Sequence, residues 1–224
     1  MTNEWSYVAL QEQANYKRRT LDEVKASKNH IIQWLLLEEN KEHKEILEIG
    51  CGIGIYMGDY ITMGFEDPLG IELDEVATRI AWENLLLVAL GDMRDMPYDN
   101  NRFDIVTAHG SIEHIPETEV VLKEIYRVLK KDGLLLLNVP YKYSFFVLAK
   151  WIQKLFKIWR CGYEKSFGQN ELINLLEDNG FKIIEIKWSE IEVGTRHPFL
   201  TKCLRFLDKI INGKHMIWIK CQKK

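Results

Sequence analysis

The stretch Glu45-Ile46-Leu47-Glu48-Ile49-Gly50-Cys51-Gly52-Ile53-Gly54 decides the fold of this chain. Its apolar run, interrupted by Glu48, ends in three glycines at alternating positions, which is typical of a buried parallel strand that breaks into a tight turn. Glycine lets such a turn adopt positive φ and lets a ligand approach bare backbone. Residues 55–63 can then begin a helix whose N-terminal amides face the same ligand. The stretch therefore predicts a strand, a ligand-contacting turn and a helix in succession.

The glycine spacing separates two classes of nucleotide-binding protein. The chain has G-x-G-x-G, whereas the dinucleotide-binding motif is G-x-G-x-x-G. A nicotinamide-dependent oxidoreductase is therefore the weaker alternative, and no Tyr/Lys pair or histidine marks a site of hydride transfer. A glycine turn alone identifies no ligand, because many strand-to-helix turns use glycine for geometry only.

Composition predicts one soluble domain over residues 1–224. The chain is 46% hydrophobic and 28% charged, and no apolar run approaches the roughly 20 residues that span a bilayer. The start of the chain lacks the pattern of a signal peptide. The cysteines are scattered, which predicts reduced thiols in a cytoplasmic protein and no metal site; they are Cys51, Cys161, Cys203 and Cys221. The net charge of −3 gives no reason to expect a nucleic-acid partner.

Strand and helix signals alternate along the chain, which predicts a doubly wound α/β fold with a mostly parallel sheet. The expected strands are residues 46–49, 69–73, 85–90, 103–108, 134–139, 181–188 and 216–221. The expected helices after the glycine turn are residues 74–84, 117–130 and 169–179, the second ended by Lys131-Asp132-Gly133 and the third by Gly180. Residues 1–44 read as a helical lead-in.

Two carboxylates stand where successive strands end. Glu72 closes the second strand, and Asp92 follows the third. Ligands of doubly wound sheets bind at the carboxyl ends of the strands, so these acids should meet the glycine turn. A carboxylate at Glu72 can accept both hydroxyls of a ribose, and one at Asp92 can accept from an exocyclic amine. Leu73 and Met93 would supply apolar walls for a flat ring.

The ordered set of motifs resembles the class I S-adenosylmethionine-dependent methyltransferases, over roughly residues 45–188. The matching stretches are residues 46–54, 70–74, 91–98, Phe103-Asp104-Ile105-Val106, Ile112-Glu113-His114-Ile115-Pro116 and 127–134, with weaker likeness at 163–167, 171–172 and 179–181. The resemblance implies a seven-stranded, Rossmann-like sheet with an antiparallel last strand, and S-adenosylmethionine as the cofactor.

The resemblance also implies roles for individual residues. Glu48 would hold the ammonium side of the cofactor, Glu72 the ribose and Asp92 the adenine amine. The expected cofactor-binding residues are Glu48, Gly50, Cys51, Gly52, Gly54, Glu72, Leu73, Asp92, Met93 and His109. His109 and His114 are the candidates for a general base. Glu113-His114 also resembles the quinone O-methyltransferases, in which a further upstream acid helps to bind a metal, but Gly110 occupies that position here.

Two basic amphipathic segments depart from the minimal fold. Residues 141–160 carry a charge of +5 and residues 196–214 a charge of +4, and both have aromatic residues on their apolar sides. We expect 141–165 and 192–214 to be insertions on the substrate side that form a lid. The alternative is contact with an anionic membrane surface, as in interfacial helices. The two interpretations are compatible for an apolar substrate.

The sequence therefore predicts transfer of a methyl group to a small-molecule or lipid-like acceptor. The acceptor, the methylated atom and the oligomeric state stay open. The alternatives are the oxidoreductase and a non-catalytic S-adenosylmethionine-binding protein at a membrane surface.

Overall fold

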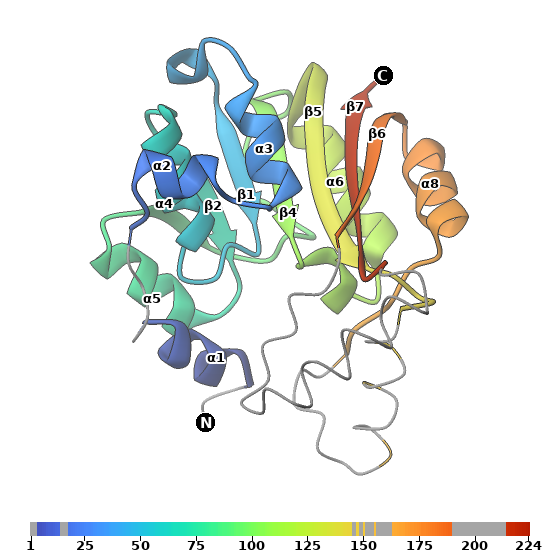
Figure 1. Cartoon of the computed structure of the whole chain (residues 1–224), viewed down its shortest axis with the longest axis horizontal. Coiled ribbons are helices and arrows are strands. Elements are labelled where there is room, and N and C mark those ends of the chain that lie inside the picture. The colour runs from blue at the N-terminus through green and yellow to red at the C-terminus, as the bar shows by residue number, and fades with distance from the viewer. Residues whose placement is uncertain are drawn as a thin grey trace.

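The centre of the protein is a seven-stranded sheet with the strand order β3-β2-β1-β4-β5-β7-β6 (Figure 1). We describe residues 4–13, 18–144, 147, 150, 155, 163–189 and 214–224 of a computed structural model. The strands are β1 (Ile46–Ile49), β2 (Leu69–Glu72), β3 (Leu87–Leu90), β4 (Phe103–His109), β5 (Leu129–Pro140), β6 (Phe181–Ser189) and β7 (Met216–Lys223).

The pairing of the strands confirms the predicted fold class. Strand β1 lies between β2 and β4 and is parallel to both, and β3 and β5 extend the parallel part outward. Strand β7 is antiparallel to its neighbours β5 and β6. The result is the mostly parallel sheet with an antiparallel last strand that the sequence predicts. Its strand order reverses beside β1, and such a switch point is where doubly wound sheets bind ligands.

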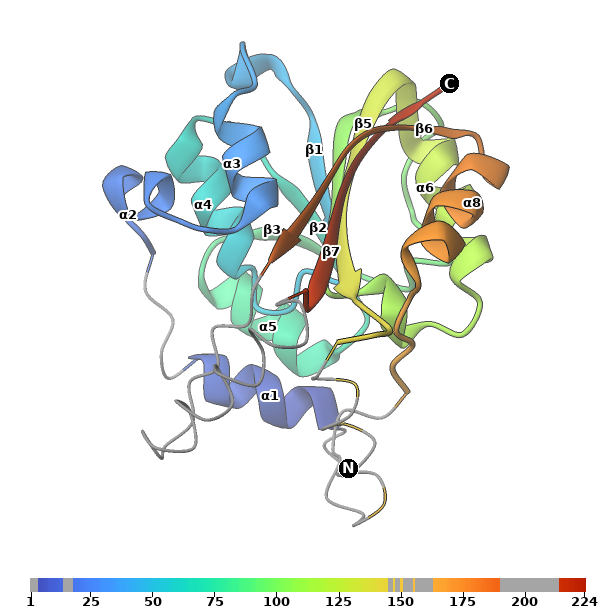
Figure 2. The same ribbon diagram turned by 45° about the vertical axis from the view of Figure 1, so that its right-hand side comes forward.

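Helices cover both faces of the sheet (Figures 1 and 2). The described helices are α1 (Glu4–Gln13), α2 (Leu21–Lys25), α3 (His30–Leu36), α4 (Ile55–Met63), α5 (Glu75–Glu83), α6 (Thr118–Val128) and α8 (Gln169–Asp178), with 3₁₀ turns η1 (Lys41–His43) and η2 (Ile112–His114). Helices α3 and α4 lie on one face, and α6 and α8 on the other. Helix α1 lies beside α5 at the end of the sheet where the parallel strands finish.

Each face has its own apolar core, because strand side chains alternate between the two faces. On the α6 and α8 face, buried residues such as Val106, Leu137 and Ile219 pack against Ile125 and Leu172. On the α3 and α4 face, residues such as Ile105, Leu136 and Trp218 pack with Trp34 and Tyr60. The sheet is thus fixed from both sides, which holds the ends of its strands in place.

The prediction for residues 129–133 was wrong. Helix α6 ends at Val128 rather than Lys130, and Leu129 already pairs with Phe103 as the first residue of β5. The register between β4 and β5 then shifts, so that Ile105 pairs with Leu134. The left-handed conformation in the intervening residues belongs to Asp132, with φ 62°, and not to a helix-ending glycine. The third strand, β3, begins at Leu87, two residues later than the sequence predicts.

The two basic segments lie mainly outside the described residues. The predicted lid therefore also lies outside them. Lys150 is described, and the sequence placed it on the solvated side of its segment. In the structure its side chain is buried, its Nζ lies 2.9 Å from Glu164 Oε1, and it donates to Ser166 Oγ at 2.8 Å. This lysine is therefore a buried ion-pair partner rather than part of a charged surface.

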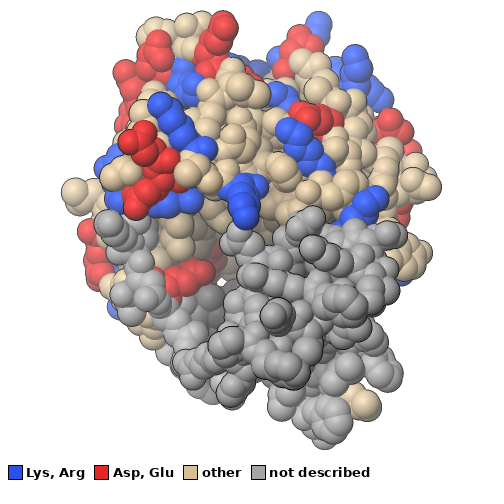
Figure 3. Space-filling view, in the orientation of Figure 1, with Lys and Arg blue, Asp and Glu red and all other residues tan. Residues whose placement is uncertain are grey.

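Charges on the described surface are mixed. Lys and Arg side chains lie among Asp and Glu side chains on the face shown in Figure 3. No helix in the described part of the chain is long and apolar enough to cross a membrane.

Gly133 lies so close to neighbouring backbone that only glycine fits at this position. A Cβ at this position would lie 2.9 Å from the carbonyl oxygen of Lys130 and 3.2 Å from that of Asp104. Backbone cannot yield as a flexible side chain can, so Gly133→Ala should lower the free energy of unfolding by about 1–3 kcal/mol in urea titrations. At Gly168 the nearest atoms would be 3.8 Å away, and Gly168→Ser is the matched control, expected to change stability little. Equal stability of the two variants would contradict this account.

Candidate active site

A cavity of about 290 Å³ opens at the carboxyl ends of the parallel strands. It lies between the ends of β1, β2 and β4 and the first residues of α4 and α5. Its lining comprises Ala9, Glu12, Glu48, Gly50, Cys51, Gly52, Ile55, Tyr56, Glu72, Leu73, Asp74, Ala77, Asp92, Met93, His109, Gly110, Ser111, His114 and Ile115. Of the predicted site residues, this set contains all except Gly54.

The glycine turn forms the floor of the cavity. Gly50 and Gly52 have φ of 63° and 55°, the left-handed region that favours glycine. A Cβ on Gly50 would lie 2.7 Å from Ser111 Cβ, whereas one on Gly52 would meet nothing within 4 Å. Gly50 therefore allows the turn to pack closely against the loop after β4, and Gly52 leaves bare backbone beside open space.

Gly54 has a different place from the one predicted. It is the residue before α4, with φ 82°, and a Cβ there would lie 2.2 Å from Leu86 Cδ1. It is not among the residues that line the cavity. The structure thus explains this third glycine by the start of the helix and its packing.

Glu72 connects the glycine turn to the start of α5. Its Oε2 accepts a hydrogen bond from the Gly52 N–H at 2.9 Å, and its Oε1 accepts one from the Asp74 N–H at 2.8 Å. Asp74 in turn caps α5 through the Ala77 N–H and accepts from Ser6 of α1 at 2.7 Å. The carboxylate is held by backbone donors on two elements and faces the cavity.

Asp92 forms an ion pair with Arg94, a contact that the sequence analysis did not predict. Arg94 donates to both carboxylate oxygens of Asp92, at distances from 2.6 to 3.1 Å, and also lies 3.1 Å from Glu117. The guanidinium lowers the pKa of Asp92 below its usual range. Asp92 is therefore a fixed, ionised acceptor at the edge of the cavity, beside Met93.

Glu48 is a buried acid with an unpaired oxygen. Its side chain is 1% exposed, and its Oε2 has no hydrogen-bond partner. Burial, and then the nearby carboxylates of Asp59 and Glu72, raise the pKa of Glu48 well above its ordinary value. Leaving a buried polar group unpaired costs about 1–3 kcal/mol, so this oxygen is poised for a cationic or hydrogen-donating partner.

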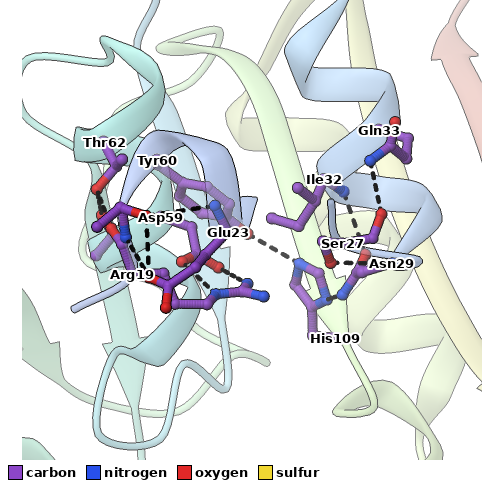
Figure 4. Close-up of polar contacts among 12 residues, drawn as sticks. Arg19, Glu23, Ser27, Asn29, Ile32, Gln33, Asp59, Tyr60, Thr62 and His109 are labelled. Carbon is purple, nitrogen blue, oxygen red and sulfur yellow. Dashed lines mark hydrogen bonds and ion pairs between the residues drawn. The ribbon is translucent and has the colours of Figure 1, made fainter. Parts of the chain in front are cut away.

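His109 is fixed at both ring nitrogens (Figure 4). Asn29 Oδ1 accepts from the Ile32 N–H, so its amide nitrogen faces His109 Nδ1, at 3.4 Å. Nδ1 is then the acceptor, and Nε2–H donates to Tyr60 OH at 2.9 Å. The Tyr60 hydroxyl in turn donates a hydrogen bond to Thr107 Oγ1 at 3.1 Å.

This arrangement does not fit the predicted role of His109 as a general base. Its lone pair is taken by Asn29, and burial lowers the pKa of His109 to about 3. The ring instead stacks on Tyr56, with 3.9 Å between centroids and 14° between planes. His109 is a neutral, rigid wall of the cavity.

The segment that carries Asn29 is itself anchored to α4. Arg19 donates through Nε to Asp59 Oδ1 at 2.9 Å and through Nη2 to Oδ2 (Figure 4). Asp59 is 1% exposed. This pair holds the start of α2 against α4, and α2 leads directly to the Asn29 cap of α3.

The loop after β4 adds three polar residues. His114 Nδ1 lies 2.9 Å from the carbonyl oxygen of Tyr163, so Nδ1–H donates a hydrogen bond to it. Ser111 lines the cavity, and its Oγ is buried without a partner. Glu113 points elsewhere: it is 3% exposed with an unpaired Oε2, and burial raises the pKa of Glu113 to about 8.

Sequence reasoning missed several lining residues. Tyr56 and Ser111 carry no motif, since aromatic and hydroxyl residues are common near any turn. Ala9 and Glu12 belong to α1, whose position over the cavity depends on its packing against α5. Cys51 does line the cavity, and burial raises the pKa of its thiol well above the ordinary value, which disfavours the thiolate. In the described ranges, no group of three or more His, Cys, Asp or Glu could hold a metal.

Comparison with known proteins agrees with this geometry. Residues 47–137 match a family model described as a methyltransferase domain. Demethylmenaquinone methyltransferase of Lactobacillus johnsonii is 28% identical over 170 residues, which cover 66% of the chain and 68% of that enzyme. Ubiquinone biosynthesis O-methyltransferase of Pseudomonas syringae is 26% identical over 186 residues and 76% of each chain.

A solved methyltransferase from Archaeoglobus fulgidus, described as S-adenosylmethionine-dependent, has the same fold. Its TM-score is 0.68 at 21% identity, over 97% of this chain and 99% of that one, and at this identity the likeness shows the fold alone. The domain match, the relatives and the fold together confirm the prediction of an S-adenosylmethionine-dependent methyltransferase. S-adenosylmethionine is its cofactor, and these findings set aside the oxidoreductase alternative.

The protonated carboxyl of Glu113 makes stability depend on pH. Its pKa is about 8 in the folded protein and near 4.5 when exposed, so the folded state keeps a proton that the unfolded state releases. The contribution is complete below about pH 4.5 and is lost as pH rises toward 8. Glu113→Gln removes this loss, so the variant should exceed the unmodified protein in free energy of unfolding by roughly 2–4 kcal/mol at pH 8 and by little at pH 4.5.

Urea titrations at the two pH values measure the difference. Glu119→Gln, at an exposed position of α6, is the control and should leave the pH dependence unchanged. Parallel pH profiles for Glu113→Gln and the unmodified protein would show that Glu113 is ionised when folded.

Proposed function

We propose that the cavity binds S-adenosylmethionine and that the protein transfers its methyl group to a small, lipid-like acceptor. The observation that carries the proposal is the Glu72 carboxylate, held between the amides of the glycine turn and of α5, beside the open space at Gly52. The cofactor supplies a sulfonium-bound methyl that is already activated. The task left to the protein is to hold cofactor and acceptor in line.

The residues around the cavity fit the groups of the cofactor. The unpaired Glu48 Oε2 suits the ammonium group, and the unpaired Ser111 Oγ can pair with its carboxylate. The lone pairs of Glu72 that its two amide donors leave unused suit the ribose hydroxyls. Asp92, ionised and oriented by Arg94, suits the adenine amine, with Leu73 and Met93 on either side of the ring. Gly50, Cys51 and Gly52 would pass beneath the sugar and the methionine portion.

We assign the two histidines different roles. His109, neutral and stacked on Tyr56, would form the wall beside the transferred methyl group. His114 lines the same cavity, with its Nδ1 held by the carbonyl oxygen of Tyr163, so it is the better candidate for taking a proton from an oxygen or nitrogen acceptor.

The proposed acceptor class rests on two observations. The relatives named above act, by their names, on demethylmenaquinone and in ubiquinone biosynthesis. The two basic segments of this chain also combine lysines with aromatic residues, which favours an apolar acceptor reached from a lipid surface.

A labelling experiment tests this acceptor class. Labelled methyl from S-adenosylmethionine should enter the organic phase when a cell extract that contains the protein is partitioned between water and organic solvent. Label confined to the aqueous phase would contradict a lipid-like acceptor.

Cofactor affinity tests the proposed pocket. Glu72→Ala and Asp92→Ala should each weaken S-adenosylmethionine binding by about 10–100-fold in calorimetry, since hydrogen bonds to a charged group contribute about 1.5–3 kcal/mol. Glu75→Ala is the matched control, because Glu75 is exposed and pairs with Arg79 on the outside of α5. Unchanged affinity in both test variants would remove the pocket assignment.

Membrane contact is a separate proposal, based on the charge of residues 141–160 and 196–214. The protein should co-sediment with vesicles that contain phosphatidylserine, and binding should weaken as salt rises. Exchanging Lys202 and Arg205 for glutamate should weaken binding further, whereas exchanging Lys182 on β6 should not. Absence of binding at low salt would rule the proposal out.

A further inference from the structure

A row of polar side chains crosses the sheet next to the cofactor cavity. His109 of β4 pairs in register with Asn138 of β5, and Asn138 pairs with Trp218 of β7. Register partners project to the same face, and directly opposite residues in an antiparallel pair have Cβ atoms roughly 4.5–5.5 Å apart. The three side chains therefore lie side by side, and His109 is shared with the cavity.

Two atoms in this row have no partner. Asn138 Oδ1 and Trp218 Nε1 are buried and make no hydrogen bond, and the two residues are 7% and 8% exposed. The first is an acceptor and the second a donor. Leaving two such groups unpaired lowers stability, whereas apolar side chains of similar shape at both positions would avoid this loss. His109, the third residue of the row, has a partner at each ring nitrogen, so the unpaired atoms of Asn138 and Trp218 need their own explanation.

The start of α3 lies over the row. Asn29 contacts His109, and the next residue, His30, places its ring edge-on to Trp218 with 5.6 Å between centroids. His30 is itself held by the carbonyl oxygen of Trp188 at 3.2 Å. The same helix start that fixes the wall of the cofactor cavity thus also packs against Trp218.

We infer that Asn138 and Trp218 form the part of the acceptor site that recognises a hydroxyl group. This inference rests on the proposed function. A hydroxyl can donate its proton to Asn138 Oδ1 while it accepts from Trp218 Nε1–H, so one group satisfies both orphan atoms. A ketone or an ether has no proton for Asn138, and a methyl group satisfies neither atom. The acceptor class is accordingly a hydroxyl-bearing ring compound, such as a phenol or a hydroquinone.

A pair of isosteric probes tests the inference. Phenol and toluene differ only in the hydroxyl and methyl groups. With S-adenosylhomocysteine at saturation, phenol should shift the indole N–H resonance of Trp218 in ¹⁵N-labelled protein, and toluene should not. Trp218→Phe assigns that resonance. Asn138→Leu should weaken phenol binding about tenfold, the effect of one lost hydrogen bond, and leave toluene unaffected.

The controls separate this site from the pocket and from a structural water. Affinity for S-adenosylhomocysteine is measured first and should be the same in Asn138→Leu and the unmodified protein. If the unmodified protein does not bind S-adenosylhomocysteine, that result contradicts the proposed function instead. If a structural water bridges the two atoms instead, Asn138→Leu should be less stable than the unmodified protein, and the Trp218 resonance should respond equally to phenol and toluene. That result, or no shift with phenol, would overturn the inference.

Discussion

The site depends on one carboxylate, that of Glu72. Its two oxygens accept backbone hydrogen bonds from Gly52 and Asp74, which belong to the turn after β1 and the start of α5. The Gly50 and Cys51 N–H groups donate to the carbonyl oxygen of Ile71, and the carboxylate of Glu72 supplies the partner of the Gly52 N–H. The same oxygens face the cavity. The group that shapes the turn is thus also the one best placed to bind a polyhydroxyl ligand.

A second constraint acts from the N-terminal side of the chain. Arg19 and Asp59 hold α2 against α4, and Asn29 then reaches His109. His109 becomes a neutral ring between Tyr56 and Tyr60 instead of a base. Rigid walls suit a reaction in which positioning supplies most of the acceleration. The N-terminal helices therefore contribute to the site itself, and α1 brings two residues to its lining.

The sheet and most of the cavity could be predicted from the sequence because their signals are local. Strand β1 and helix α4 begin and end where the apolar run and the glycines indicate, and Glu72 and Asp92 follow from their place at strand ends. The end of α6 was misjudged because Gly133 resembles a helix terminator, while its actual role is a close contact with the backbone at Asp104.

Other features could not be predicted because they arise from contacts between distant segments. Arg94 lies two residues from Asp92, yet nothing in this spacing predicts that its guanidinium donates to the Asp92 carboxylate. Lys150 belongs to an amphipathic pattern, but its burial depends on Glu164 and Ser166. The unpaired atoms of Asn138 and Trp218 become visible only through strand register and burial.

The most direct test of the account is a crystal structure of the protein with S-adenosylhomocysteine. We predict that both ribose hydroxyls lie within hydrogen-bond distance of Glu72 and that the adenine ring lies between Leu73 and Met93, with its amine at Asp92. A ligand bound elsewhere, or a ribose that does not contact Glu72, would contradict the central claim.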